Sequence, residues 1–121
     1  MAWLHFTAVS NLPSAFVDLK LDNTVGYMAN GTPIRDFAPQ SGRLVIVGEE
    51  PLLECARGTN GLPALLLYGK PGWNCDVDAR PTLSAGTPWQ FYQQTTLTDL
   101  FQTFDLAPSP NSSGFYRAVR R

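Results

Sequence analysis

Two aspartates, Asp76 and Asp78, have the spacing in this sequence that is best suited to chemistry. They lie two residues apart in the segment WNCDVDAR, in which apolar and polar residues alternate. Side chains at positions i and i+2 of a β-strand point to the same face of the sheet, so both carboxylates should share a face. There they could hold a Ca²⁺ ion, which takes oxygen ligands, or work as a general acid and base. The same alternation is that of an ordinary solvated face, and the sequence favours this last interpretation.

The only histidine of the chain, His5, would have to serve any catalytic site that needs an imidazole. No serine or cysteine in the sequence has the local signature of a nucleophile, and no group of residues has the spacing of a transition-metal site. His5 falls on the more polar face of an alternating segment, which favours a surface histidine. We therefore predict no catalytic triad and no cofactor, with calcium at Asp76 and Asp78 as the one ion that the sequence suggests.

Three tryptophans and four tyrosines are a large supply of aromatic side chains for 121 residues. Trp73 and Trp89 fall in phase with the apolar residues of their segments, which predicts a core position, since a tryptophan buries a large apolar area. Trp3 and Tyr92 fall on the opposite faces. Because exposed aromatic patches mark binding surfaces, Trp3 and Tyr92 are the predicted ligand-binding residues.

The two cysteines, Cys55 and Cys75, are too few to make a disulfide framework. A free cysteine usually behaves as a small core hydrophobe. In an oxidising compartment the two could instead form a bridge, provided that their Cα atoms lie within about 7 Å. Both alternatives stay open at this point.

Composition narrows the classes of partner. Nine basic and ten acidic residues are spread along the chain without a block of like charge, so no basic surface for nucleic acid is expected. No apolar run approaches the roughly 18 to 20 residues that span a membrane. The opening segment MAWLHFTAVSNLPSAF lacks the basic start and apolar centre of a signal peptide.

The elements that must position these residues are short strands. Ten prolines and ten glycines separate short apolar runs, many of which alternate with period two. We predict an all-β protein, an antiparallel β-sandwich of immunoglobulin or fibronectin style with little or no helix. Asn30-Gly31 has the residues of a tight hairpin turn. The one helix candidate, residues 97–104, is too short and too rich in threonine and phenylalanine to stand alone.

The segment GEEP, residues 48–51, couples a glycine and a proline to two charges between apolar runs and is the best internal boundary. We predict two β regions, residues 1–50 and 51–121. Exposed sheet edges of such regions could also pair in a homo-oligomer.

Residues 52–119 resemble a known type of module. The turn residues Gly69, Pro71 and Gly72, the later Trp89 and the ending Phe115-Tyr116-Arg117-Ala118 are similar to the small C-terminal β-sandwich modules of large secreted bacterial multidomain proteins. Residues 1–48, with the segments SAFV, NGT and GRLVIV, resemble the last strands of a cohesin-like or carbohydrate-binding sandwich.

This resemblance implies a non-catalytic extracellular module that belongs to a longer exported protein. It would bind polysaccharide or a protein partner at the cell surface. The alternative from another class is a small hydrolase acting on a polysaccharide, ester or lactone through Asp76 and Asp78, with or without a metal ion.

The final segment GFYRAVRR alternates as a strand, with Phe115, Arg117 and Val119 on one face and Tyr116 and Ala118 on the other. We predict a paired, structural strand in which Phe115 or Tyr116 packs against Trp89 and Phe91. Its arginines should be solvated ends, because they lack a wider basic surface.

Overall fold

The structure is a computed structural model, and it describes residues 7, 12–21, 25–34, 40–106 and 114–121. This part of the chain is all-β: it contains short strands in antiparallel sheets and no helix, as the sequence predicts. No helix able to cross a membrane is therefore found among these residues. Trp3 and His5 lie outside the described residues.

The chain divides into two compact units. One consists of Val47–Arg121 together with the stretch up to Ala15, and the other consists of Phe16–Ile46. In the first unit Ser14 connects the early stretch to the GEEP segment, because its Oγ accepts a hydrogen bond from the Gly48 amide at 2.8 Å and donates one to the Glu50 carbonyl. A side chain at Gly48 would collide with the backbone of residues 12–14.

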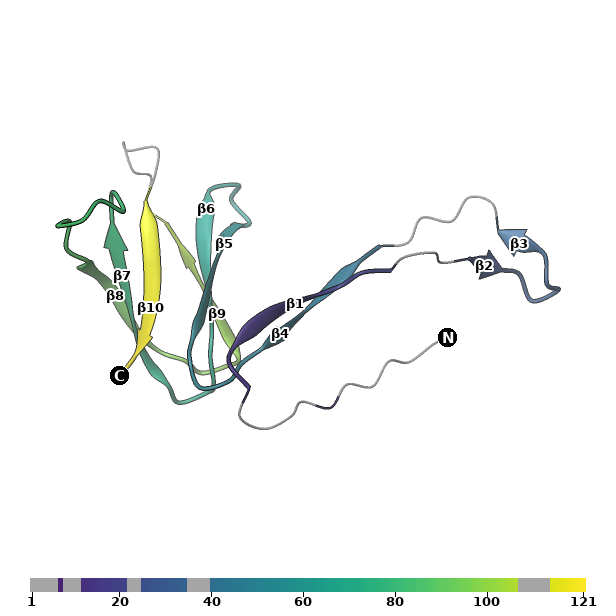
Figure 1. The fold of residues 1–121 in the computed structure, drawn as a ribbon, viewed down its shortest axis with the longest axis horizontal. Helices are drawn as coiled ribbons and strands as arrows, with labels where there is room; N and C mark the ends of the chain where they lie inside the picture. Colours follow the sequence, from purple (N-terminus) through teal and green to yellow (C-terminus); the bar gives the residue numbers. More distant parts are fainter. Residues whose placement is uncertain (1–6, 8–11, 22–24, 35–39, 107–113) are drawn as a thin grey trace. The chain divides into compact units, whose positions relative to one another are not determined.

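The first unit has six strands in two three-stranded sheets (Figure 1). One sheet has the order β5-β6-β9 and the other the order β10-β7-β8, and every neighbouring pair is antiparallel. Each sheet therefore places a strand from late in the chain beside its central strand. The strands are β5 (Leu52–Arg57), β6 (Pro63–Tyr68), β7 (Asn74–Arg80), β8 (Gln90–Thr96), β9 (Phe101–Asp105) and β10 (Phe115–Arg120).

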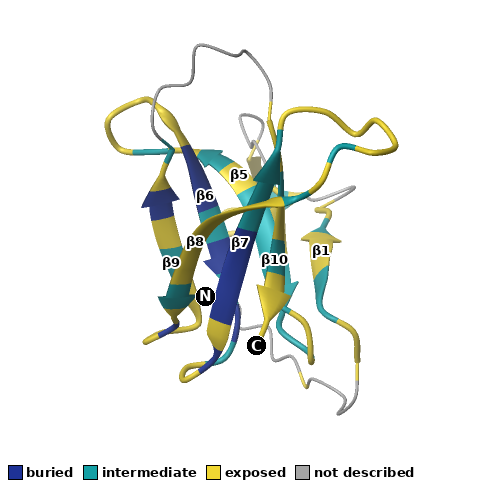
Figure 2. Ribbon diagram, turned by 90° about the vertical axis from the view of Figure 1, so that its left-hand side faces the viewer, coloured by how far each residue is buried: buried dark blue, intermediate teal, exposed yellow. Residues whose placement is uncertain are grey.

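The core lies where side chains from both sheets meet. Its buried members come mainly from the central strands β6 and β7. Figure 2 shows the buried stretch of β7, residues 75–77, in dark blue, while its neighbour β8 is largely exposed. Tyr116 and Ala118 of β10 pack against this cluster, which confirms their predicted common face. The buried cluster is Leu65, Leu67, Trp73, Cys75, Val77, Leu97 and Phe104.

The Gly69–Gly72 turn, between β6 and β7, depends on glycine in two ways. Gly72 has φ +88°, a conformation that favours glycine. A Cβ at Gly69 would lie 2.4 Å from Cδ1 of Leu97, so the absence of a side chain lets Leu97 enter the core with only 1% of its surface exposed. The Leu97 backbone is held there by two hydrogen bonds, one donated to the Trp73 carbonyl and one accepted from the Gly72 amide.

The second unit, Phe16–Ile46, is built from two-stranded pieces. β1 (Ala15–Leu19) pairs with β4 (Gly42–Ile46), and β2 (Gly26–Tyr27) pairs antiparallel with β3 (Pro33–Ile34). The turn between β2 and β3 contains Asn30 and Gly31, the latter at φ +83°, as the sequence predicts. No described residue of this unit is buried.

The structure decides two points that the sequence left open and corrects a third. The helix candidate 97–104 overlaps a strand, β9 (Phe101–Asp105), whose backbone pairs with the central strand β6. Cys55 is exposed and Cys75 is buried, and both are free thiols, so they form no bridge. Trp89 is not in the buried cluster, and its position is described below.

Candidate functional site

The outer face of the β10-β7-β8 sheet is built from alternate residues of its central strand. Cys75 and Val77 of β7 point into the core, so Asp76, Asp78 and Arg80 belong to the opposite, outer face. The register adds their cross-strand neighbours: Asp78 lies between Arg117 and Phe91, and Arg80 lies opposite Phe115. Directly opposed residues point to the same side of a sheet, so aromatic and charged side chains meet here.

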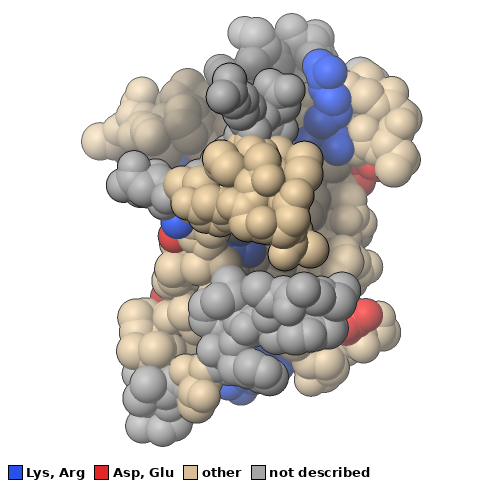
Figure 3. Space-filling model, turned by 90° about the vertical axis from the view of Figure 1, so that its right-hand side faces the viewer, with Lys and Arg blue, Asp and Glu red and all other residues tan. Residues whose placement is uncertain are grey.

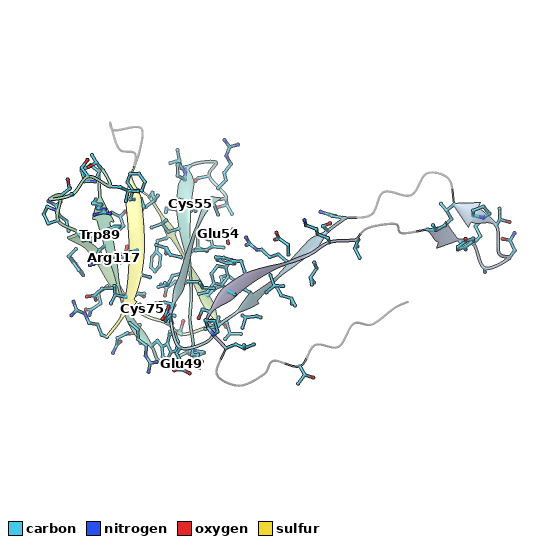
Figure 4. The ribbon with its side chains drawn as sticks, viewed as in Figure 1. Glu49, Glu54, Cys55, Cys75, Trp89 and Arg117 are labelled. Atoms are coloured by element: carbon cyan, nitrogen blue, oxygen red, sulfur yellow. The ribbon has the colours of Figure 1, made fainter. Side chains whose placement is uncertain are left out.

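Trp89 stands just before β8 and contacts two guanidinium groups of this face. The Cζ atom of Arg80 lies 4.3 Å from the centre of the indole ring, and that of Arg117 lies 4.7 Å from it. Both distances are well within the range of cation–π attraction. Trp89 and Arg117 are labelled side by side in Figure 4. The expected core position of Trp89 is therefore wrong, because its ring packs against two arginine side chains on the outer face.

Asp78 holds one of these arginines in place. Its Oδ2 accepts hydrogen bonds from Nε of Arg117 at 2.9 Å and from Nη2 at 2.8 Å. The Asp78 side chain is 17% exposed and that of Arg117 is 47% exposed, so the pair is anchored on the sheet but reaches solvent at the arginine. Two charge-assisted hydrogen bonds fix the guanidinium orientation more firmly than a single contact would.

Asp76, one row along the same face, is paired with Arg121. Its side chain is only 4% exposed, and Oδ2 accepts the hydrogen bond from Nε of Arg121 while Oδ1 has no partner among the described atoms. The hydrogen bond to Asp76 is the main cause that raises the pKa of Arg121. Arg117 and Arg121 are therefore ion-pair partners of the sheet, and their side chains are also 47% and 68% exposed. The tail arginines are solvated, as the sequence predicts, but they are also paired with carboxylates.

The predicted carboxylate pair thus occupies one face, as the alternation indicates, but each carboxylate has its own arginine. In the ranges that the structure describes, no group of three or more His, Cys, Asp or Glu side chains is arranged to hold a metal ion. Two aspartates, each bound to an arginine, have the geometry of structural ion pairs. This geometry gives the hydrolase alternative no support.

The exposed aromatic residues of this face complete the candidate site. Phe91 is 65% exposed and Phe115 is 37% exposed. Phe115 lies opposite Arg80, and Phe91 lies opposite Asp78, the partner of Arg117. We call this surface the Trp89 platform, defined by Arg80, Trp89, Phe91, Phe115 and Arg117. It offers apolar ring faces and guanidinium donors on a β-sheet support, which together suit a ligand with both apolar ring faces and polar groups.

Tyr92, a predicted ligand residue, lies on the other side of β8. Its ring makes an edge-on contact with Tyr116, with the ring centres 5.7 Å apart. Burial is the main cause that raises the pKa of Tyr116. In the β7–β8 pair, Val77 pairs with Gln93 and Asp78 pairs with Phe91, which leaves Tyr92 without a partner on β7. Tyr92 is therefore the extra residue of a β-bulge. It retains 38% exposure, and the structure does not bring it onto the Trp89 platform.

A second aromatic and cationic cluster lies at the other end of β10. Arg120 and Lys70 approach the ring of Trp73 at 4.4 and 5.4 Å. Both cations also pair with Glu49, at 3.5 and 3.1 Å. Trp73 is only 8% exposed, as its predicted core position requires, so these cations cover the edge of a core residue and do not form a ligand surface.

Charged side chains elsewhere are interspersed with uncharged ones. On the side shown in Figure 3, the described Lys and Arg and the described Asp and Glu side chains form small separate groups. Cys55, labelled in Figure 4 on β5, is an exposed thiol beside Glu54, whose Oε2 accepts a hydrogen bond from the Tyr68 hydroxyl at 3.0 Å. These features do not combine donors and ring faces as the Trp89 platform does.

Sequence reasoning missed the central residues of the platform, Arg80 and Trp89. A signal was present, because Trp89 and Phe91 alternate with Gln90 and so must share a face. Which face is the outer one depends on pairing with β7, and period two does not specify that. Comparisons of the chain with protein-family models, with curated protein sequences and with solved structures found no significant match.

Proposed function

We propose that residues 47–121 are an immunoglobulin- or fibronectin-like module of a longer exported bacterial protein, and that the module binds polysaccharide without catalysing a reaction. The Trp89 platform is the observation that carries this proposal. Phe91 exposes 65% of its surface on the sheet face that also carries a tryptophan and two arginines, and ring stacking with polar donors is the chemistry that binds sugar rings. The resemblance of residues 52–119 to modules of secreted proteins supports the same function.

The ion pairs that Asp76 and Asp78 form on this face support a binding function and not catalysis. Asp78 fixes the Arg117 guanidinium through two hydrogen bonds, so part of the surface is ordered before a ligand arrives. Preorganised groups lose little conformational entropy on binding, which favours affinity. The carboxylates that hydrolysis would need are the ones engaged in these pairs.

A pull-down with a panel of insoluble polysaccharides tests the proposal. Phe91→Ala should weaken binding about tenfold, which corresponds to about 1.4 kcal/mol, because an exposed ring face is lost. The matched control is Phe101→Ala, which removes a 54% exposed phenylalanine from β9 of the other sheet and should leave binding unchanged. The proposal would be overturned if the wild-type chain were retained by no member of the panel and also bound none of the soluble polysaccharides used below.

Trp3 and Tyr92 stay predicted ligand residues and are tested in the same assay. Trp3→Ala and Tyr92→Phe are the informative changes, since the second keeps the contact with Tyr116 and removes only a hydroxyl. A loss of binding with either variant, with Phe91→Ala unaffected, would move the ligand surface away from the platform.

A second candidate function, self-association, is favoured by the unit Phe16–Ile46. Phe16 and Val17 are neighbours in β1 and therefore point to opposite faces, yet each is 38% exposed. A two-stranded ribbon is marginally stable alone, so apolar residues on both faces call for a covering sheet. Residues 16–46 carry three basic and three acidic side chains, so charge does not oppose a second copy of this chain as the cover.

Sedimentation of the whole chain over a range of concentrations tests this second candidate. The wild type should dimerise or form larger species, and Val17→Lys should shift it towards monomer. Leu83→Lys, at a 57% exposed position in the β7–β8 loop, is the control for the added charge. A wild-type chain that stays monomeric at all concentrations would contradict self-association and would leave the polysaccharide proposal intact.

A further inference from the structure

The charges of the Trp89 platform do not balance. Arg117 is neutralised by Asp78, and one row away Arg121 is neutralised by Asp76. Arg80, on the same face, has no carboxylate partner in the described ranges, and its buried Nε atom makes no hydrogen bond there. The outer face therefore carries one uncompensated positive charge beside the exposed aromatic rings.

Trp89 fixes the position of this unpaired charge. The Arg80 guanidinium lies 4.3 Å from the indole centre, on the same ring that Arg117 approaches at 4.7 Å. A guanidinium that packs on an aromatic ring keeps its planar fork available at its edge, and that fork matches a carboxylate or sulfate. Arg80 is thus oriented by Trp89, and its Nε–H has no acceptor in the part of the chain that the structure describes. Because Nε is buried, a ligand would reach the guanidinium through its η nitrogens.

A neutral ligand laid over this face would cover the Arg80 charge without compensating it, which disfavours binding. An anionic group at the same place would gain a charge-assisted hydrogen bond in a partly desolvated site. The rings of Phe91 and Phe115 lie beside it and offer apolar faces to the sugar. The platform is therefore complementary to sugar rings that carry acidic substituents.

We propose, on the basis of the polysaccharide function above, that the ligand is an acidic polysaccharide whose carboxylate or sulfate group is bound by Arg80. Matched pairs of polymers separate the two anions from the sugar backbone. Polygalacturonate and its methyl ester differ only in free carboxylates, and dextran sulfate and dextran differ only in sulfates.

Affinity electrophoresis of the whole chain in gels that contain each of the four polymers measures the preference. The wild type should bind one acidic polymer at least tenfold more tightly than its neutral counterpart. Arg80→Ala should remove most of that preference, and Arg80→Lys should restore part of it, because lysine keeps the charge and loses the planar fork. Which acidic polymer binds identifies the carboxylate or the sulfate as the recognised group.

Arg57→Ala is the matched control, since it removes one exposed arginine from β5 of the other sheet and changes the net charge equally. It should leave the preference unchanged. An equal loss in both variants would show non-specific attraction and overturn the inference. The wild-type preference should also fall with added NaCl, a result that does not depend on how well Arg80→Ala folds.

The two proposals fail in different ways. If the insoluble panel retains the chain but no acidic polymer is preferred, the acidic ligand is refuted and the polysaccharide function stands. If no polysaccharide of either set binds, the function itself is refuted.

Discussion

Leu97→Ala should be among the most destabilising substitutions in the unit that contains Val47–Arg121. Leu97 lies between β8 and β9, only 1% exposed, in the space that Gly69 leaves open beside Trp73. Hydrogen bonds to Trp73 and Gly72 hold the backbone of Leu97 in place. This segment therefore cannot move inward to fill the cavity that the smaller side chain leaves. Cavities that cannot collapse carry the largest cost.

The expected loss is about 3 kcal/mol, since buried Leu→Ala substitutions cost about 2–5 kcal/mol. A domain of this size shifts its melting temperature by roughly 4–8 °C per kcal/mol, so Tm should fall by about 12–24 °C. Urea unfolding followed by tryptophan fluorescence measures the free energy directly, and the m-value should not change.

The matched control is Leu100→Ala, three residues away in the same connection but 56% exposed. It should change stability by no more than about 0.5 kcal/mol. If the two substitutions cost the same, the packing of Leu97 against the Gly69–Gly72 turn is refuted.

Gly69→Ala adds an independent check of the same contact. In the wild type its new Cβ would meet Leu97 Cδ1 at 2.4 Å, and overpacking of this kind costs about 1–3 kcal/mol. In the Leu97→Ala background that atom is absent, so Gly69→Ala should cost much less. Costs that simply add would contradict the contact.

Four further predictions follow from burial and pairing. At pH 7 iodoacetamide should label exposed Cys55 in the native chain and buried Cys75 only after unfolding, and native labelling of both would contradict the core position of Cys75. Burial raises the pKa of Cys75 above its ordinary value of 9.0, so the stability tied to the neutral thiol is complete below the unfolded pKa and is lost as the pH rises through the folded one. Urea unfolding at pH 7 and pH 10 should show a smaller pH dependence for Cys75→Ala than for the wild type, and equal dependence would refute this role. Removal of residues 114–121 should give insoluble protein, because it bares an edge of β7 and strips Tyr116 from the core, whereas a soluble product with unchanged Tm would contradict a structural role for β10. A peptide of residues 15–46 should show random-coil amide shifts by NMR, and dispersed shifts at low concentration would show that the unit needs no cover.

Local patterns in the sequence were sufficient for much of the fold. Period two in WNCDVDAR and GFYRAVRR separates the core face from the outer face of β7 and β10 correctly. The Asn30-Gly31 turn needs positive φ, which glycine supplies at Gly31. These features are local, so neighbouring residues are enough to predict them.

The site could not be predicted in the same way, because it is made by pairing between distant strands. Arg117 and Asp78 are 39 residues apart in sequence and meet only through the β10–β7 register. Sequence reasoning predicted a contact of Phe115 or Tyr116 with Trp89 and Phe91. The structure shows that Tyr116 contacts Tyr92 and that the Arg117 guanidinium lies over the Trp89 ring. On β8, aromatic residues occupy both faces, so alternation alone could not identify the core side.

The most direct test of the central claim is an NMR titration of the isotopically labelled chain with an oligosaccharide of the polymer that it retains. The account predicts that the largest shifts occur at the Trp89 indole N–H, the Arg80 and Arg117 Nε–H groups and the amides near Phe91. Largest shifts on β5, β6 and β9, or in residues 16–46, with these signals unmoved, would contradict the assignment of the outer face of the β10-β7-β8 sheet as the binding surface.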